Sequence, residues 1–179
     1  MPHPQCSVFI AASLDGFIAR PDGAIDWLGP MARPGEDYGY QRFFDSIDAI
    51  VFGRKTYETA LGFDAWPYAG KRCVVLTHRP LEARHGEERH EGVLDVLVDR
   101  LGAEGVRRAY IDGGEVIRQF LAAGLIDDLT ISIVPVLLGE GLPLFGGGAE
   151  RWLRLVESRA FPSGLVQVEY RIERAAAGS

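Results

Sequence analysis

Short, uninterrupted apolar runs recur along the first two thirds of the chain. Residues 49–52 (AIVF) and 7–12 (SVFIAA) are the clearest examples, and residues 71–77 and 108–112 are similar. A run of this length without polar alternation is typical of a strand buried on both faces of a parallel sheet. The pattern therefore predicts strands at these four positions.

Segments with helical spacing follow or separate these runs. We expect helices at residues 36–47, from residue 54 onward, at 93–101 and at 115–123, the last ended by Gly124. Alternation of strands with helices predicts a sheet that is mainly parallel at its centre.

The pattern changes to β-rich from residue 126. Residues 153–161 and 165–172 are typical of a hairpin, because apolar and polar side chains alternate in its second arm. The chain is therefore predicted to be an α/β protein with three layers (α/β/α), a mixed, mainly parallel central sheet and an antiparallel C-terminal hairpin. We expect a single domain over residues 1–179, with an ordered core at about 5–174 and a frayed tail at 175–179.

Two segments lack a clear period. Residues 13–35 contain four glycines and three prolines, which makes a functional loop a reasonable expectation. Residues 81–92 are polar and are also expected to form a loop.

Composition narrows the function. The 179 residues carry 25 acidic side chains against 19 Lys and Arg, so the net charge of −6 argues against a general nucleic-acid binder. Cys6 and Cys73 form no CxxC pair, which favours the reducing cytoplasm, and no zinc-ligand spacing is present. No signal peptide and no apolar run of membrane-spanning length is seen.

Glycines and cations follow three of the predicted strands. Gly53 is followed by Arg54-Lys55-Thr56, a second strand ends in Thr77-His78-Arg79, and a third in Gly113-Gly114-Glu115. The N–H groups of a first helical turn and nearby cations bind anions. The carboxyl ends of parallel strands lie at one edge of a sheet, so these three segments together predict a phosphate site at that edge. Any one of them alone could equally be a strand–helix connection with solvated cations.

Standard nucleotide motifs are missing. No GxGxxG follows a strand, and no GxxxxGK[ST] is present, so the site must be of another type.

The motifs that are present resemble those of the dihydrofolate reductase-like superfamily. GRKTYE (residues 53–58), LTHRP (76–80) and IDGGEVIRQFL (111–121) resemble its cofactor-binding segments. AASLDGFIA and VPVLLGEGLPLF resemble more closely the riboflavin biosynthesis reductase (RibD C-terminal) domain and its stand-alone bacterial relatives. The ordered set spans residues 8–172.

The resemblance implies an NADPH site. It places Ala11 and Ile18 beside the nicotinamide. The phosphates are assigned to Gly53, Arg54, Lys55 and Thr56, and the 2′-phosphate pocket to Leu76, Thr77, His78 and Arg79. The pyrophosphate turn is assigned to Gly113, Gly114, Glu115, Val116 and Ile117. Ile117 stands where folate reductases often have an aromatic residue.

The substrate side is also implied by the resemblance. Asp37 stands sixteen residues before Gly53, where dihydrofolate reductases keep a catalytic carboxylate, and Thr130 resembles its hydrogen-bond partner. A buried carboxylate there would have a raised pKa and assist protonation, but Asp37 also suits a helix start.

Two further residues have two interpretations each. Asp15 is a candidate for substrate contact or a turn-forming residue, and Trp27 for a substrate cap or a core residue. Asp112 stands where riboflavin-type domains tend to carry glutamate.

The resulting hypothesis is an NADPH-dependent oxidoreductase that transfers hydride to a small pterin, aminopyrimidine or ribosylamino-pyrimidine. The alternatives are dihydrofolate reductase activity proper and a nucleotide-binding accessory protein without turnover. The chain lacks a deaminase zinc motif, and resemblance to the riboflavin-type domains implies a homodimer.

Overall fold

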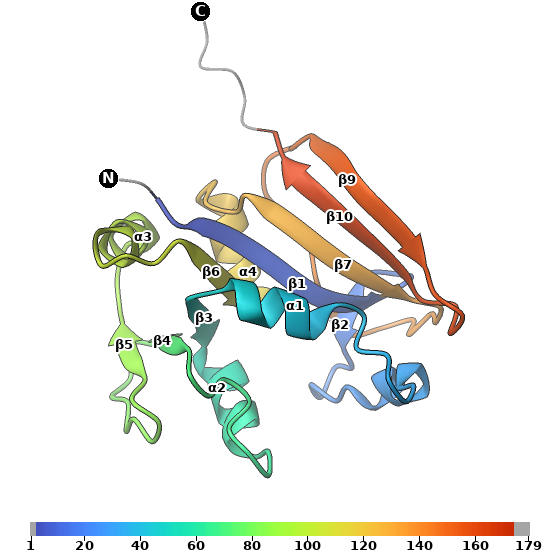
Figure 1. The fold of residues 1–179 in the computed structure, drawn as a ribbon, viewed down its shortest axis with the longest axis horizontal. Helices are drawn as coiled ribbons and strands as arrows, with labels where there is room; N and C mark the ends of the chain where they lie inside the picture. The colour runs from blue at the N-terminus through green and yellow to red at the C-terminus, as the bar shows by residue number, and fades with distance from the viewer. Residues whose placement is uncertain (1–2, 174–179) are drawn as a thin grey trace, which may run out of the picture.

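The computed structural model describes residues 3–173, and its central feature is an eight-stranded sheet (Figure 1). The strand order is β5-β4-β3-β6-β1-β7-β10-β9, parallel from β5 to β7, with β10 and β9 antiparallel. The strands are β1 (Gln5–Ser13), β3 (Ala49–Gly53), β4 (Arg72–Leu76), β5 (Glu88–His90), β6 (Arg108–Asp112), β7 (Asp128–Val134), β9 (Leu153–Ala160) and β10 (Val166–Ile172). The predicted α/β fold with a mixed, mainly parallel sheet is confirmed; the predicted tail at 175–179 lies outside the described residues.

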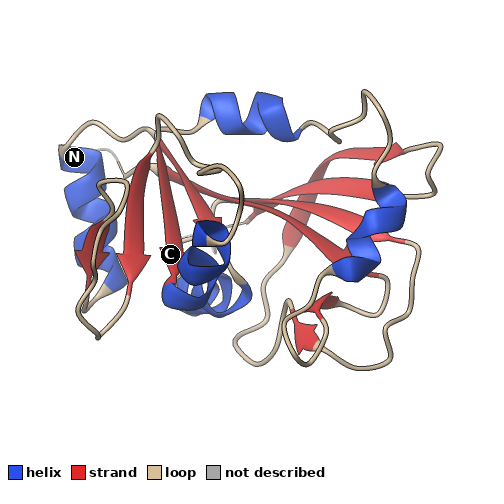
Figure 2. Ribbon diagram, turned by 90° about the horizontal axis from the view of Figure 1, so that it is seen from below, coloured by secondary structure: helices blue, strands red, loops and turns tan. Residues whose placement is uncertain are grey.

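Helices cover both faces of the sheet. In Figure 1, α1 lies in front of the central strands and α4 behind them, and Figure 2 shows the sheet between the helices. The helices are α1 (Tyr40–Ser46), α2 (Arg54–Leu61), α3 (Leu94–Ala103), α4 (Gly114–Ala122) and the 3-10 helix η1 (Asp26–Met31).

The apolar run of β3 explains why two cores form. Side chains alternate across a strand, so Ile50 and Phe52 pack with Phe43 of α1, while Ala49 and Val51 pack with the residues under α3 and α4. All four are fully buried. The predicted burial of this strand on both faces is confirmed.

Two element predictions are wrong. The helix expected at residues 36–47 begins only at Tyr40, because Tyr38 (φ 54°) and Gly39 (φ 83°) adopt left-handed backbone that a helix excludes. The loop expected at residues 81–92 contains β5, which extends the sheet beyond β4.

The irregular segment after β1 contains η1 and the short strand β2 (Phe17–Ala19). β2 pairs with β8 (Leu142–Pro143) in a separate two-stranded sheet, which ties this segment to the loop after β7. None of the helices described between residues 3 and 173 is long and apolar enough to span a membrane.

Candidate functional site

Three adjacent strands of the sheet carry the glycine and cation motifs. β4, β3 and β6 are neighbours and parallel, so their carboxyl ends lie on one edge of the sheet. This edge brings together the residues that follow each strand, although the chain reaches β6 only after β5 and α3. We call this edge the rim.

Two helices begin at the rim without side-chain caps. α2 follows Gly53 and α4 follows Gly113, and neither N-cap position makes a side-chain hydrogen bond to the helix start. The first N–H groups of a helix have no partner within the helix. Together with the helix dipoles, the two uncapped starts favour an anion at the rim.

Close approach explains the paired glycines. A Cβ added to Gly113, which has φ 90°, would lie 2.6 Å from Thr56 Oγ1, and one added to Gly114 would lie 2.5 Å from Ile18 Cδ1. Thr56 and Ile18, two predicted cofactor residues, therefore pack directly against this turn. Any side chain at either glycine would force these neighbours to move.

Arg54 connects the ends of β3 and β4. Its Nη1 donates to the Pro80 carbonyl at 3.0 Å and lies 3.5 Å from Thr77 Oγ1, and its Nε donates to Glu58 at 3.0 Å. Its neighbour Lys55 is exposed. These cations give the rim a positive charge that a phosphate would share.

The segment after β4 contacts Arg89, a residue of β5 that the sequence interpretation missed. Thr77 is buried and accepts a hydrogen bond from the Arg79 N–H at 3.2 Å, whereas the His78 and Arg79 side chains are exposed. Arg89 of β5 donates to the carbonyls of Thr77 (3.2 Å) and His78 (3.0 Å). Its segment was predicted to be a loop, so no motif pointed to it.

The first turn of α4 corrects the prediction for Ile117. Ile117 is fully buried in the core and its N–H donates to the Gly113 carbonyl at 2.9 Å, so neither group is available to a cofactor. Val116 is also buried in this core, while Glu115 is exposed. The amphipathic phase of the helix turns both apolar side chains into the core, where Val116 Cγ2 lies 3.3 Å from the position of a Cβ added to Gly53. The backbone N–H contact expected of Val116 stays a prediction.

Asp37 does not have the environment predicted for a catalytic carboxylate. It is exposed, and its two oxygens accept the N–H groups of Gly39 (2.9 Å) and Gln41 (3.0 Å). These bonds, Gln41 first, lower the pKa of Asp37, so the expected burial, raised pKa and pairing with Thr130 are wrong. Asp37 instead stabilises the start of α1.

The other substrate-side candidates lie on different elements. Trp27 of η1 is buried against Val134 and Leu165, so the core interpretation is the one observed, although its indole N–H has no hydrogen-bond partner within residues 3–173. Thr130 lies half-buried on β7, between its pairing partners Phe9 of β1 and Glu169 of β10.

Asp15 fixes the loop after β7. Its carboxylate accepts the Ser13 hydroxyl at 2.6 Å and the N–H groups of Leu138 (3.1 Å) and Gly139 (2.8 Å). These bonds, Ser13 first, lower its pKa. Asp15 is thus more than a turn-forming residue, because it joins two loops beside β2.

Ala11 and Leu76 are the remaining predicted cofactor residues. Ala11 packs half-buried beside the Trp27 cluster on β1, and Leu76 ends β4 opposite Gly53. Only Leu76 is thereby placed at the rim.

Asp112 is the acid next to the glycine turn. Its oxygens accept the Gly113 N–H at 2.9 Å and the Tyr68 hydroxyl at 3.3 Å. Burial raises the pKa of this carboxyl, which keeps its proton to higher pH than an exposed aspartate. It is the rim residue best suited to hold a proton.

The donor set fits a phosphorylated ligand. Uncapped N–H groups, arginine side chains and glycines without room for a Cβ are the features that phosphate groups require. Among residues 3–173, no group of three or more His, Cys, Asp or Glu could hold a metal ion.

Comparison with known proteins identifies the family. The family model described as the RibD C-terminal domain matches residues 4–167. The uncharacterized protein YwjB of Bacillus subtilis is 37% identical over 168 residues, which cover 91% of this chain and 95% of YwjB. Dihydrofolate reductase HdrB of Haloferax volcanii is 32% identical over 125 residues, covering 66% of this chain and 62% of HdrB.

A solved structure agrees with the family match. The crystal structure of a candidate riboflavin biosynthesis protein from Shewanella sp. PV-4 superimposes with a TM-score of 0.89 at 36% identity, covering 95% of this chain and 99% of that one. Solved RibD proteins share the fold. The chain belongs to the RibD C-terminal domain family.

Proposed function

We propose that this protein is an NADPH-dependent reductase that transfers hydride to a small heterocycle of the aminopyrimidine, ribosylamino-pyrimidine or pterin type. Within this class, 5-amino-6-(5-phosphoribosylamino)uracil reductase activity is the first candidate, because the family model is that of the RibD C-terminal domain. The observation that carries the proposal is the pair of uncapped helix starts on the neighbouring strands β3 and β6.

In this proposal the rim residues bind and orient the cofactor. The N–H groups at the start of α4 bind the pyrophosphate, and Arg54 binds the phosphates from the end of β3. Thr77 and the cations after β4 surround the 2′-phosphate. NADPH, when bound, supplies the hydride, and the protein contributes position and charge.

Asp112 is the proposed proton donor in place of Asp37. Reduction of a C=N bond adds hydride to carbon and a proton to nitrogen, so the site needs an acid that is protonated near the working pH. Asp112 directly precedes Gly113, and burial raises its pKa. Tyr68 donates to its Oδ2, which orients the carboxyl group.

Two alternatives remain to be tested against this one. The identity to HdrB favours a dihydrofolate reductase, but the exposed Asp37 lacks the environment that such an activity would need. An accessory protein would bind the dinucleotide without turnover.

The test combines binding with turnover. We expect protein fluorescence titrations to show tighter binding of NADPH than of NADH, and Arg54→Ala to weaken NADPH binding about tenfold, the size of one charge-assisted contact. Arg107→Ala is the matched control, because Arg107 precedes β6 at the opposite edge of the sheet and its side chain is 89% exposed. Equal binding of the two cofactors, or none, contradicts the assignment.

Substrate choice is read from NADPH oxidation. The ribosylamino-pyrimidine and dihydrofolate are compared as substrates, and turnover of the first alone supports the riboflavin-type activity. Turnover of dihydrofolate alone supports the folate activity, and tight NADPH binding without turnover supports the accessory protein.

We also propose a homodimer formed through the C-terminal hairpin, and a cytoplasmic location. Every residue of β9 is exposed, and large apolar side chains around it face solvent: Phe145, Trp152, Leu153, Leu155, Val156 and Val166. An exposed apolar group of this kind is typical of a protein interface.

A further inference from the structure

A carboxylate lies among the cations at the end of β4. Glu91 Oε1 is 3.1 Å from His78 Nδ1, and Glu91 Oε2 forms an ion pair with Arg89. His78 belongs to the part of the rim where the 2′-phosphate is proposed to bind, and Arg89 of the neighbouring β5 donates to the His78 carbonyl. An acid therefore contacts two of the donors that this phosphate would use.

The sheet brings these residues together. The Thr77 N–H donates to the His90 carbonyl at 3.1 Å, so the ends of β4 and β5 lie side by side. His78 directly follows Thr77, and Glu91 directly follows His90. Arg89 cannot easily turn away, because it also donates to the carbonyls of Thr77 and His78.

A carboxylate and a phosphate accept hydrogen bonds from the same donors. The two contacts, His78 first, lower the pKa of Glu91, so the side chain is ionised at neutral pH. A phosphate approaching His78 and Arg89 would meet a like charge and compete for occupied donors. A ribose with a 2′-hydroxyl would carry no such charge.

We propose that Glu91 is a specificity-determining residue of the cofactor site, which competes with the 2′-phosphate for His78 and Arg89 and so narrows the preference for NADPH over NADH. The inference rests on the proposed function. In this inference Arg54 and Thr77 favour NADPH over NADH, and Glu91 reduces that preference.

The test measures binding of 2′,5′-ADP, NADPH and NADH to the full chain and to Glu91→Gln. We expect Glu91→Gln to bind 2′,5′-ADP and NADPH about fivefold more tightly, the size of a partly exposed charge contact, with NADH unchanged. The gain should shrink at high salt, which screens exposed charges. Adding Arg89→Gln to the Glu91→Gln variant should abolish the gain in affinity for 2′,5′-ADP and NADPH.

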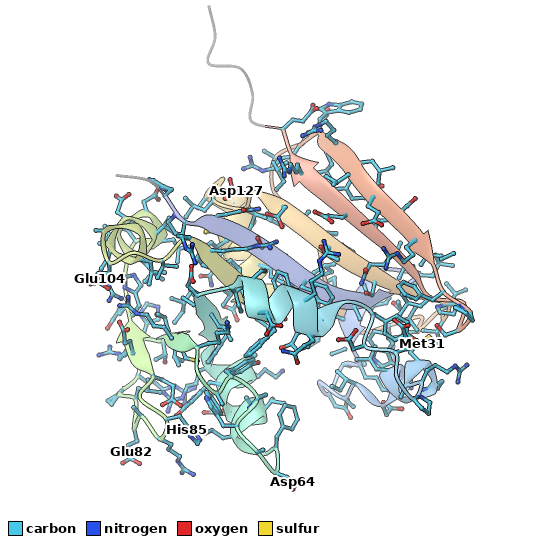
Figure 3. All side chains as sticks on the ribbon, in the orientation of Figure 1. Met31, Asp64, Glu82, His85, Glu104 and Asp127 are labelled. Carbon is cyan, nitrogen blue, oxygen red and sulfur yellow. The ribbon has the colours of Figure 1, made fainter. Side chains whose placement is uncertain are left out.

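Glu82→Gln is the matched control. Glu82 is exposed on the loop between β4 and β5 (Figure 3), and its carbonyl, not its carboxylate, accepts the Tyr57 hydroxyl. It should leave all three affinities unchanged. Circular dichroism and thermal unfolding establish that each variant is folded.

Each other outcome overturns the inference. If Glu91→Gln changes neither affinity and NADPH is still preferred, Glu91 has no role in cofactor choice. The proposed function is unaffected by that result. Weaker NADH binding would make Glu91 an acceptor for the 2′-hydroxyl instead. If no nucleotide binds either the wild-type protein or the variant, the cofactor site itself is refuted, and the inference with it.

Discussion

The hydroxyl of Thr56, in the first turn of α2, packs against the backbone of Gly113, the residue before α4. A Cβ at Gly113 would lie 2.6 Å from Thr56 Oγ1, well inside van der Waals contact. The starts of α2 and α4 can therefore lie this close only because residue 113 has no side chain and the Thr56 hydroxyl fills the space. In the proposed cofactor site, their separation sets the position of the bound phosphate.

Gly113→Ala should destabilise the protein by about 3 kcal/mol, because it combines a left-handed backbone position with a steric clash. In a Thr56→Ala background the cost should fall to about 1 kcal/mol, since the clashing oxygen is gone. Urea unfolding of the four proteins of this cycle measures both values.

Gly105→Ala is the control for that cycle. Gly105 has φ 89°, but nothing lies within 4 Å of the position that a Cβ would take there, so this substitution isolates the backbone cost. An equal loss of stability in Gly105→Ala and Gly113→Ala would contradict the packing between Thr56 and Gly113.

Asp112→Asn should reduce the pH dependence of stability and abolish most of the turnover. Burial raises the pKa of Asp112, so its contribution to stability is present at low pH and is lost as pH rises through its folded-state pKa. As pH rises above the ordinary aspartate pKa of about 4, the variant should therefore lose less stability than wild type.

Unfolding curves across this pH range and NADPH oxidation rates provide the two measurements. Parallel pH profiles of wild type and variant would contradict the raised pKa. Unchanged turnover would remove Asp112 as proton donor.

Glu88→Gln should lower stability at neutral pH by about 1 kcal/mol but not below about pH 2. Glu88 accepts hydrogen bonds from Arg72 and Arg100, and these contacts, Arg72 first, lower its pKa to about 2. The stabilisation is therefore present above the ordinary glutamate pKa and is lost as pH falls through the folded-state value. Acid unfolding monitored by circular dichroism tests this, with the exposed Glu140→Gln as control.

Asp15→Ala should release the loop after β7. The carboxylate of Asp15 accepts hydrogen bonds from the N–H groups of Leu138 and Gly139, which help to lower its pKa. These hydrogen bonds should also weaken at acidic pH, when the carboxylate becomes protonated. Amide hydrogen exchange at these two residues should accelerate. Asp22→Ala removes a bond only to nearby Ala24 and should leave their exchange unchanged.

Leu155→Glu should convert the proposed dimer to a monomer. Leu155 of β9 is 52% exposed, and a charge there would be buried in an interface through this hairpin. Analytical ultracentrifugation of wild type and variant gives the result. A wild-type monomer, or a dimer that survives the substitution, would contradict the proposed interface.

The pattern of the sequence was sufficient for the strand–helix alternation and for the glycine and cation joints. Residues 49–52 could be assigned because a strand buried on both faces must be apolar at every position. Gly113 could be singled out because a pair of glycines directly follows a predicted strand. These are local properties, which depend on a few neighbouring residues.

The tertiary structure decided which side chains meet. Asp37 is exposed because the left-handed turn at Tyr38 and Gly39 delays the start of α1, and no periodicity in the sequence encodes that turn. The sequence alone determined that this protein would carry strand ends suited to phosphate. Only the pairing of β5 with β4 placed Arg89 and Glu91 beside His78, because contacts between strands depend on their order and register in the sheet.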